Sequence, residues 1–249
     1  MNYRSWTLHG LEFRMLMEHA GRDRLPFPIQ FQPTADSGAD YHRQRHEARC
    51  AVDRTMDDDL RVAVDTLVAP QVRIEVVGHR TSSGKVRGHA AVGHDVAVVL
   101  TQGPGDSEFS GGPVTVTLLE SFRAVTAVLA VLPTANPGTS ATMTVAEPGR
   151  AADDPQSPLI RRASRRTDDE RFEKLFSSPP SCAGEILVCT GPATDNRFED
   201  GTTGVNWVDF DGDGRYLIRH GSMLTVTPAS SSDFAAHIAD LVTRALWTD

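Results

Sequence analysis

Hydrophobic and polar residues alternate along the middle of the chain. After Gln71, the residues Val72, Ile74 and Val76 are separated by Arg73 and Glu75, which is the period-two pattern of a strand with one buried face. Comparable patterns predict three more strands, and Thr81-Ser82-Ser83-Gly84 predicts the hairpin turn after the first. The predicted strands cover residues 71–76, 85–92, 95–100 and 113–117.

Helical spacing flanks these strands on both sides. Before them, a short strand is expected at residues 5–8, followed by three helices at about 11–20, 41–53 and 56–69, with Thr55 as the expected N-cap of the third helix. After them, apolar residues at intervals of three and four predict a helix that ends before Pro133. Its expected buried stripe is Phe122, Val125, Leu129 and Leu132.

Residues 134–166 are rich in proline, glycine and charge, and we interpret them as a loop or linker with a short strand at about 141–145. Beyond it, Thr167 and Glu170 have capping-box spacing, so a helix is expected to begin at Asp168. Strands are then expected at 185–189, 204–219 (a hairpin) and 223–228, before a final helix capped by Ser230 and Asp233. The order of hairpin strands and then a covering helix therefore occurs twice, which indicates an α+β fold with an antiparallel sheet and an internal repeat.

Composition narrows the classes of function. The 249 residues carry a formal charge of −8, which argues against non-specific binding to nucleic acid. No apolar run approaches the roughly 20 residues that span a bilayer, and the N-terminus has no signal-peptide core. The odd, sparse set of Cys50, Cys182 and Cys189 suits a reducing compartment. We therefore expect a soluble cytoplasmic protein that binds neither nucleic acid nor membrane.

Two motifs that suggest ligand binding have a simpler interpretation. The residues from Asp209 to Gly214 match the opening of a calcium loop, but His220 stands where a bidentate Glu is needed, and the segment joins strands instead of helices. Asp-Gly pairs are typical of tight hairpin turns, so a turn is predicted. The stretch from Gly78 to Lys85 resembles a phosphate-binding loop but is one residue too long and has Val86 at the magnesium-binding position.

A possible metal site remains as an alternative. His42, His46 and Cys50 stand at i, i+4 and i+8 of one predicted helix. Three ligands in a line fit a tetrahedral metal poorly, because His42 and Cys50 would be about 12 Å apart along the axis, and no fourth ligand is nearby. An exposed polar stripe is favoured, and a small metal-dependent enzyme that uses these residues is kept as the alternative.

Three segments of the chain together carry a family resemblance. The beginning and end contribute the motifs Trp6-Thr7-Leu8, Glu12-Phe13-Arg14-Met15-Leu16, residues 21–28, Trp207-Val208-Asp209, Asp213-Gly214-Arg215-Tyr216 and Val226-Thr227-Pro228-Ala229-Ser230, and the middle contributes the strands and helix of residues 71–132. In this order the three segments resemble the EspG family, the cytosolic secretion-associated chaperones of ESX (type VII) systems.

The resemblance implies a single domain over residues 1–249, with halves 1–133 and 167–249 and a central antiparallel sheet between two helical bundles. It implies no cofactor and no catalytic residues. The implied partner is a PE–PPE heterodimer, or another helical-hairpin ESX substrate, whose exposed helical tip the chaperone keeps soluble and targets for export. Exposed strand edges also leave a homodimer open.

The family's binding surface includes the sheet, the C-terminal bundle and the loop between the first two main strands. That loop corresponds to Arg80, Ser82, Ser83, Gly84 and Lys85. Alternation puts the polar side chains of the two strands on one face, which we expect to be open, and Trp207 is either an anchor on that surface or a core residue. The expected face residues are Arg73, Glu75, Arg87 and His89. Lys85→Glu or Gly84→Asp is then predicted to weaken a complex without unfolding the chain.

Overall fold

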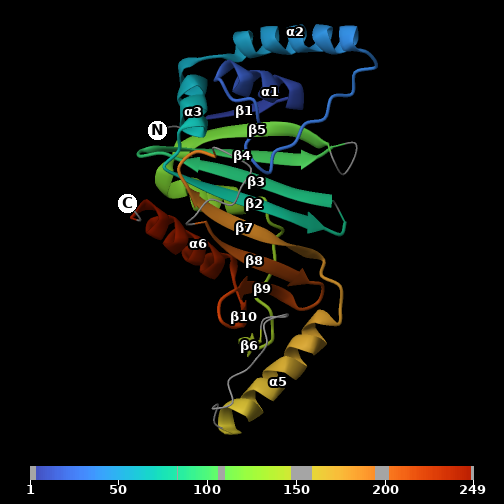
Figure 1. Cartoon of the computed structure of the whole chain (residues 1–249), viewed down its shortest axis with the longest axis vertical. Coiled ribbons are helices and arrows are strands. Elements are labelled where there is room, and N and C mark those ends of the chain that lie inside the picture. The colour runs from blue at the N-terminus through green and yellow to red at the C-terminus, as the bar shows by residue number, and fades with distance from the viewer. Residues whose placement is uncertain (1–3, 83, 106–109, 147–158, 194–201, 248–249) are drawn as a thin grey trace.

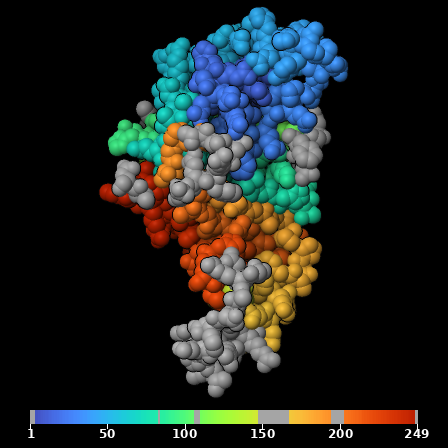
Figure 2. All heavy atoms as spheres, viewed as in Figure 1, coloured from blue at the N-terminus to red at the C-terminus, as the bar shows by residue number. Residues whose placement is uncertain are grey.

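The computed structural model describes residues 4–82, 84–105, 110–146, 159–193 and 202–247. Within them, ten strands form one sheet in the order β1-β5-β4-β3-β2-β7-β8-β9-β10-β6, with every neighbouring pair antiparallel. The strand order follows the long axis of an elongated molecule (Figures 1 and 2). The strands are β1 (Arg4–Leu8), β2 (Val72–Arg80), β3 (Gly84–Val92), β4 (Val96–Pro104), β5 (Gly111–Glu120), β6 (Met143–Val145), β7 (Cys182–Thr190), β8 (Thr203–Phe210), β9 (Gly214–Arg219) and β10 (Leu224–Pro228).

The two halves of the sheet have the same connectivity. In each half four strands follow one another as a meander, β2 to β5 and β7 to β10, and a helix comes next in the chain. The meanders meet where β2 pairs with β7, while β1 and β6 add an outer strand at either end. The predicted mixed α+β class with a large antiparallel sheet is confirmed, whereas the quasi-two-fold relation between the halves stays a prediction.

Six α-helices of the described residues cover the sheet. On one face, α4 and α6 pack over the central strands, and we call this the core face. On the opposite face, α1 and α3 lie beside β1, β5 and β4, α2 packs on the outer side of α1, and α5 lies beside β6 (Figure 1). The helices are α1 (Gly10–His19), α2 (Gly38–Thr55), α3 (Asp58–Val68), α4 (Ala124–Leu129), α5 (Leu159–Phe176) and α6 (Ser231–Leu246), and none is long and apolar enough to cross a membrane.

Three details of the predicted helices are wrong. Thr55 belongs to the last turn of α2, and Asp57 caps α3 by accepting a hydrogen bond from the Leu60 amide. Helix α5 begins at Leu159, nine residues before the expected start, because the Arg-rich residues 161–166 favour a helix more than their charge suggested. Phe122 is 76% exposed, since a 3₁₀ turn at Ser121–Arg123 rotates it out of the apolar stripe.

The segment predicted to be a linker contributes to the fold. Pro137 forms a bridge with Arg215, and the expected short strand is present as β6, paired with β10. The predicted start of the last helix is confirmed, because Ser230 and Asp233 form the capping box of α6. The predicted turn lies between β8 and β9, where Gly212 and Gly214 have φ values of 78° and 143° that other residues rarely adopt. The expected short strand is therefore confirmed, whereas the interpretation as linker is wrong for residues 159–166, which belong to α5.

Candidate partner-binding surface

Alternation along β2 and β3 places four polar side chains on the face opposite α4 and α6, as predicted. These residues, Arg73, Glu75, Arg87 and His89, are nevertheless between 1% and 7% exposed. The chain between α1 and α2, residues 20–37, crosses this face and bonds to His89 and Arg87. We call this segment the strap and the face beneath it the strap face. The expectation that these four side chains form an open surface is therefore wrong.

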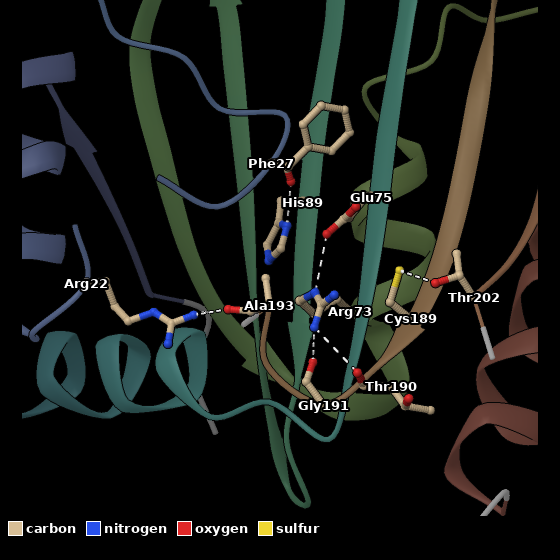
Figure 3. Close-up of polar contacts among 10 residues, drawn as sticks. All are labelled: Arg22, Phe27, Arg73, Glu75, His89, Cys189, Thr190, Gly191, Ala193 and Thr202. Carbon is tan, nitrogen blue, oxygen red and sulfur yellow. Dashed lines mark hydrogen bonds and ion pairs between the residues drawn. The ribbon is translucent and has the colours of Figure 1, made fainter. Parts of the chain in front are cut away.

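Hydrogen bonds hold the strap to the sheet. His89 Nδ1 donates to the Phe27 carbonyl at 2.8 Å, and Arg87 donates to the Gln30 side chain at 2.9 Å. The Gln102 amide accepts from the Gln30 backbone N–H at 2.9 Å and donates to its carbonyl at 2.7 Å. Figure 3 shows His89 directed at Phe27, and Arg22 of the strap reaching Ala193 after β7. The polar residues thus serve as attachment points for a segment of the same chain.

Burial changes the electrostatics of this cluster. Arg73 forms an ion pair of 3.3 Å with Glu75 and also donates to the carbonyls of Thr190 and Gly191 (Figure 3). The pKa of His89 is lowered to about 4, mainly by burial and also by the charge of Arg73, while the hydrogen bond to Phe27 opposes both effects. His89 is therefore neutral at physiological pH. Such a cluster is costly to build and is stable only while its charges stay paired.

Beyond the strap, the same face opens toward the C-terminal half. Val77 of β2 lies opposite Glu185 of β7, which lies opposite Asn206 of β8 and then Ile218 of β9. Directly opposed residues share a face, so these side chains form one row across four strands. His79 and Ala183 lie opposite each other in the next row and extend this surface. His79 is exposed, and the other five side chains are half-exposed. We call these six residues the platform.

Aromatic residues border the platform on the side of α5. Phe172 and Phe176 of α5 stack with ring centroids 4.4 Å apart, and Phe176 meets Phe210 of β8 edge to face at 5.5 Å. Phe176 remains 37% exposed. A platform of aliphatic and polar side chains beside an exposed aromatic ring has the mixed character of protein–protein interfaces.

The hairpin tip between β2 and β3 lies at the end of the platform. Arg80, Gly84 and Lys85 are half-buried and Ser82 is exposed, while Ser83 lies outside the described residues. Thr81 attaches the tip to the connection that leads into β7, since its amide donates to Ser181 and its hydroxyl to Pro180, at 3.0 and 3.2 Å. Because the tip is tied in this way, it is a fixed extension of the sheet.

Trp207 belongs to the core. It is 1% exposed and points toward the core face, against α4 and α6. Two glycines on adjacent strands make room for its indole, because a Cβ at Gly78 or Gly184 would lie 2.7 or 2.2 Å from the ring. The core alternative for Trp207 is therefore correct, and a role as a surface anchor is wrong. Gly78 and Gly184 lie just outside the predicted strands 71–76 and 185–189, so their positions in the sequence did not indicate this arrangement.

A pocket of about 630 Å³ lies behind the hairpin tip, on the core face. Its wall includes Asp209, whose two carboxylate oxygens accept from the buried Arg215 at 2.7 and 2.8 Å. Arg215 also donates to the Pro133 carbonyl at 2.7 Å, and so holds the segment after α4 against the sheet. The pocket is lined by Arg80, Thr81, Ser82, Pro133, Thr134, Ala135, Asn136, Ser181, Cys182, Asp209, Phe210, Asp211, Gly212, Asp213 and Gly214.

Neither candidate metal motif assembles a site. His42 and His46 are exposed on α2, and only His46 approaches Cys50, with Nε2 and Sγ 3.8 Å apart. In the β8–β9 turn, Asp213 accepts hydrogen bonds from Thr139 and Tyr216, which hold its pKa below the usual range although burial opposes this. No group of three or more His, Cys, Asp or Glu within the described ranges could hold a metal ion. The metal-dependent alternative therefore has no support.

Comparison with known proteins identifies relatives of the whole chain. The model of the EspG family matches residues 9–240. Among solved structures, the chain is similar to the Mycobacterium tuberculosis type VII secretion system chaperone EspG5, solved in complex with the PE25–PPE41 dimer. The TM-score is 0.52 at 12% identity, and 96% of each chain is covered, so the likeness concerns the fold. The search of curated proteins found no match.

Proposed function

The chain belongs to the EspG family, and on that premise we propose that it is a cytosolic chaperone of a type VII (ESX) secretion system. It binds the helical tip of a PPE-like substrate within a PE–PPE heterodimer, keeps that tip soluble and brings it to the secretion machinery. The observation that carries the proposal is the family match over nearly the whole chain, together with a fold shared with a chaperone solved in complex with a PE–PPE dimer.

The platform supports binding of a helical tip. A standard interface buries about 800 Å² on each partner and combines apolar contacts with a polar rim. Val77, Ala183 and Ile218 supply aliphatic contacts. Glu185 and Asn206, which lie between Val77 and Ile218 in the row, supply hydrogen-bonding groups. The chemistry is recognition alone, and the chain holds its substrate without altering it.

The test is co-expression with PE–PPE pairs from the same genome. Each pair is expressed alone and with the chain, and the soluble fraction of the PPE-like subunit is measured. We expect at least one pair to become soluble and to co-purify with the chain. If no pair gains solubility and none co-purifies, the proposal is wrong.

Charge reversal on the platform locates the contact. Glu185→Arg is expected to weaken the complex at least tenfold, whereas Glu47→Arg on the exposed surface of α2, far from the platform, is the matched control and leaves it unchanged. At the hairpin tip, Lys85→Glu is preferable to Gly84→Asp, because Gly84 has a φ of 78° and any side chain there strains the backbone. Equal binding by all of these variants would place the interface elsewhere.

A further inference from the structure

A row of four side chains crosses the core face at the ends of the central strands. Arg80 of β2 lies opposite Cys182 of β7, Cys182 lies opposite Asp209 of β8, and Asp209 lies opposite Arg215 of β9. Three of the four, all but Arg215, line the pocket behind the hairpin tip. The row therefore contains two guanidinium groups and one carboxylate.

The carboxylate is committed to one of the two cations. Both Asp209 oxygens accept from Arg215, and Arg215 is 2% exposed. Arg80, in contrast, makes no side-chain hydrogen bond or ion pair with any residue of the described ranges, and its Nε is buried without a partner. A buried donor without a partner costs about 1–3 kcal/mol, so an anion that reaches Nε of the half-buried Arg80 would gain a hydrogen bond there.

Other groups around the pocket do not supply that anion. Burial raises the pKa of the Cys182 thiol, which therefore stays protonated. Asp213 is already engaged by Thr139 and Tyr216, and Asp211 is exposed on the turn. Among the described residues that line the pocket, no carboxylate therefore pairs with Arg80.

We infer that this pocket receives an acidic side chain, Asp or Glu, from the bound substrate. The inference rests on the proposed function and adds a specificity-determining contact to it. Thr81 and Ser82 belong both to the hairpin tip and to the wall of the pocket, so a substrate that reaches the tip also reaches Arg80. Asp211 and Asp213 in the opposite wall repel a mobile polyanion such as phosphate, whereas a carboxylate on a docked protein is held by other contacts as well.

The contact has a defined geometry. A guanidinium binds a carboxylate through two parallel N–H···O bonds, which lysine cannot reproduce. A substrate lacking the acidic residue leaves Nε of Arg80 without a partner, so the pocket discriminates between substrates of otherwise similar shape.

The experiment compares Arg80→Met with wild type, using the PE–PPE pair that co-purifies with the wild-type chain. Because Arg80 has no internal partner, the variant should keep its melting temperature within about 2 °C while it binds the pair at least tenfold more weakly. Arg61→Met, on the exposed surface of α3, is the matched control and should bind as wild type does. Each acidic residue of the substrate tip is then changed in turn, Asp to Asn or Glu to Gln. One of these changes should weaken binding as much as Arg80→Met does, and the two changes combined should weaken binding no further.

Each outcome has a distinct meaning. If the wild-type chain binds a pair and Arg80→Met binds it equally well, the pocket inference is overturned while the proposed function stands. If Arg80→Met melts several degrees lower, Arg80 has a structural partner and the inference is also wrong. If inorganic phosphate raises the melting temperature of wild type but not of Arg80→Met, the pocket is a site for free anions. If wild type binds no pair at all, it is the proposed function that fails.

Discussion

The two faces of the central strands differ in what they contact. On the core face, Ile74, Val76, Ile186 and Val188 are fully buried against α4 and α6. On the other face of the same strands, charged residues are either sealed beneath the strap or, on the platform, left half-exposed. One face therefore stabilises the fold, and the other is divided between a buried polar cluster and a surface available to a partner.

This difference shows that position along a strand matters as much as the face on which a residue lies. Glu75 and Glu185 lie on the same face of neighbouring strands, yet Glu75 is paired and 7% exposed whereas Glu185 is half-exposed. Glu75 belongs to the polar cluster to which Phe27 and Gln30 of the strap are bonded, whereas Glu185 belongs to the platform. Four substitutions test this comparison of the two faces, and they follow in order from the largest expected loss of stability to the smallest.

Trp207→Ala should have the largest effect. It empties a fully buried site on the core face, and truncation of a buried aromatic residue costs about 3–5 kcal/mol of unfolding free energy. Chemical denaturation measures this loss, with unfolding monitored by far-ultraviolet circular dichroism because the substitution removes a fluorescent tryptophan. A variant that stays as stable as wild type but fails to bind substrate would show that Trp207 is an interface residue after all.

Acidification should weaken the strap face through His89. Its pKa is lowered to about 4 in the folded state from 6.5 in the unfolded state, so below pH 6.5 the unfolded chain takes up a proton that the folded chain does not. Stability should fall as the pH drops from about 6.5 to 4, by up to about 3 kcal/mol in total.

His89→Gln should flatten this dependence, as denaturation curves at several pH values will show. His237→Gln is the comparison, because burial also lowers the pKa of His237 and gives a loss of the same sign. If the wild-type and His89→Gln curves remain parallel between pH 6.5 and 4, His89 is not buried in its neutral form.

Gln102→Ala should cost less, about 2 kcal/mol. It removes the side chain that bonds to both backbone groups of Gln30 and leaves those groups without partners. The loss should be local, so that amide exchange accelerates in the strap but not in β7 or β8. Uniform acceleration across the sheet would mean that the strap is an integral part of the core.

Glu185→Arg should change stability least, within about 0.5 kcal/mol, because its side chain is half-exposed and lies on the open platform. The same substitution should abolish most substrate binding. A large loss of stability would show that the platform is covered by another part of the chain.

Much of the sheet could be predicted from local patterns. Strict alternation from Val72 to Val76 determined which residues share a face, and Ser230 and Asp233 marked the start of α6. Residues 20–37 have no such period, so nothing local indicated that they would cover Arg73, Glu75, Arg87 and His89. Trp207 was ambiguous for a related reason, since the space for its indole comes from Gly78 and Gly184, which become its neighbours only when β2 and β8 both pair with β7.

The pocket was likewise beyond local prediction. Arg80 and Asp209 are distant in the sequence and come to opposite sides of Cys182 only through the pairing of β7 with β2 and β8. The resemblance to the EspG family indicated the hairpin tip as a binding element, but it did not indicate that Arg80 points to the core face while Lys85 lies opposite His79 on the platform side.

The most direct test of the account is the mass of the purified complex. The chain is co-expressed with a PE–PPE pair from its own genome, and the eluted species is measured by light scattering during size-exclusion chromatography. The account predicts a single species with one copy each of the chain, the PE protein and the PPE-like protein, and its loss with Glu185→Arg but not with Glu47→Arg. Elution of the chain apart from every pair, or an equally stable complex with both variants, would contradict it.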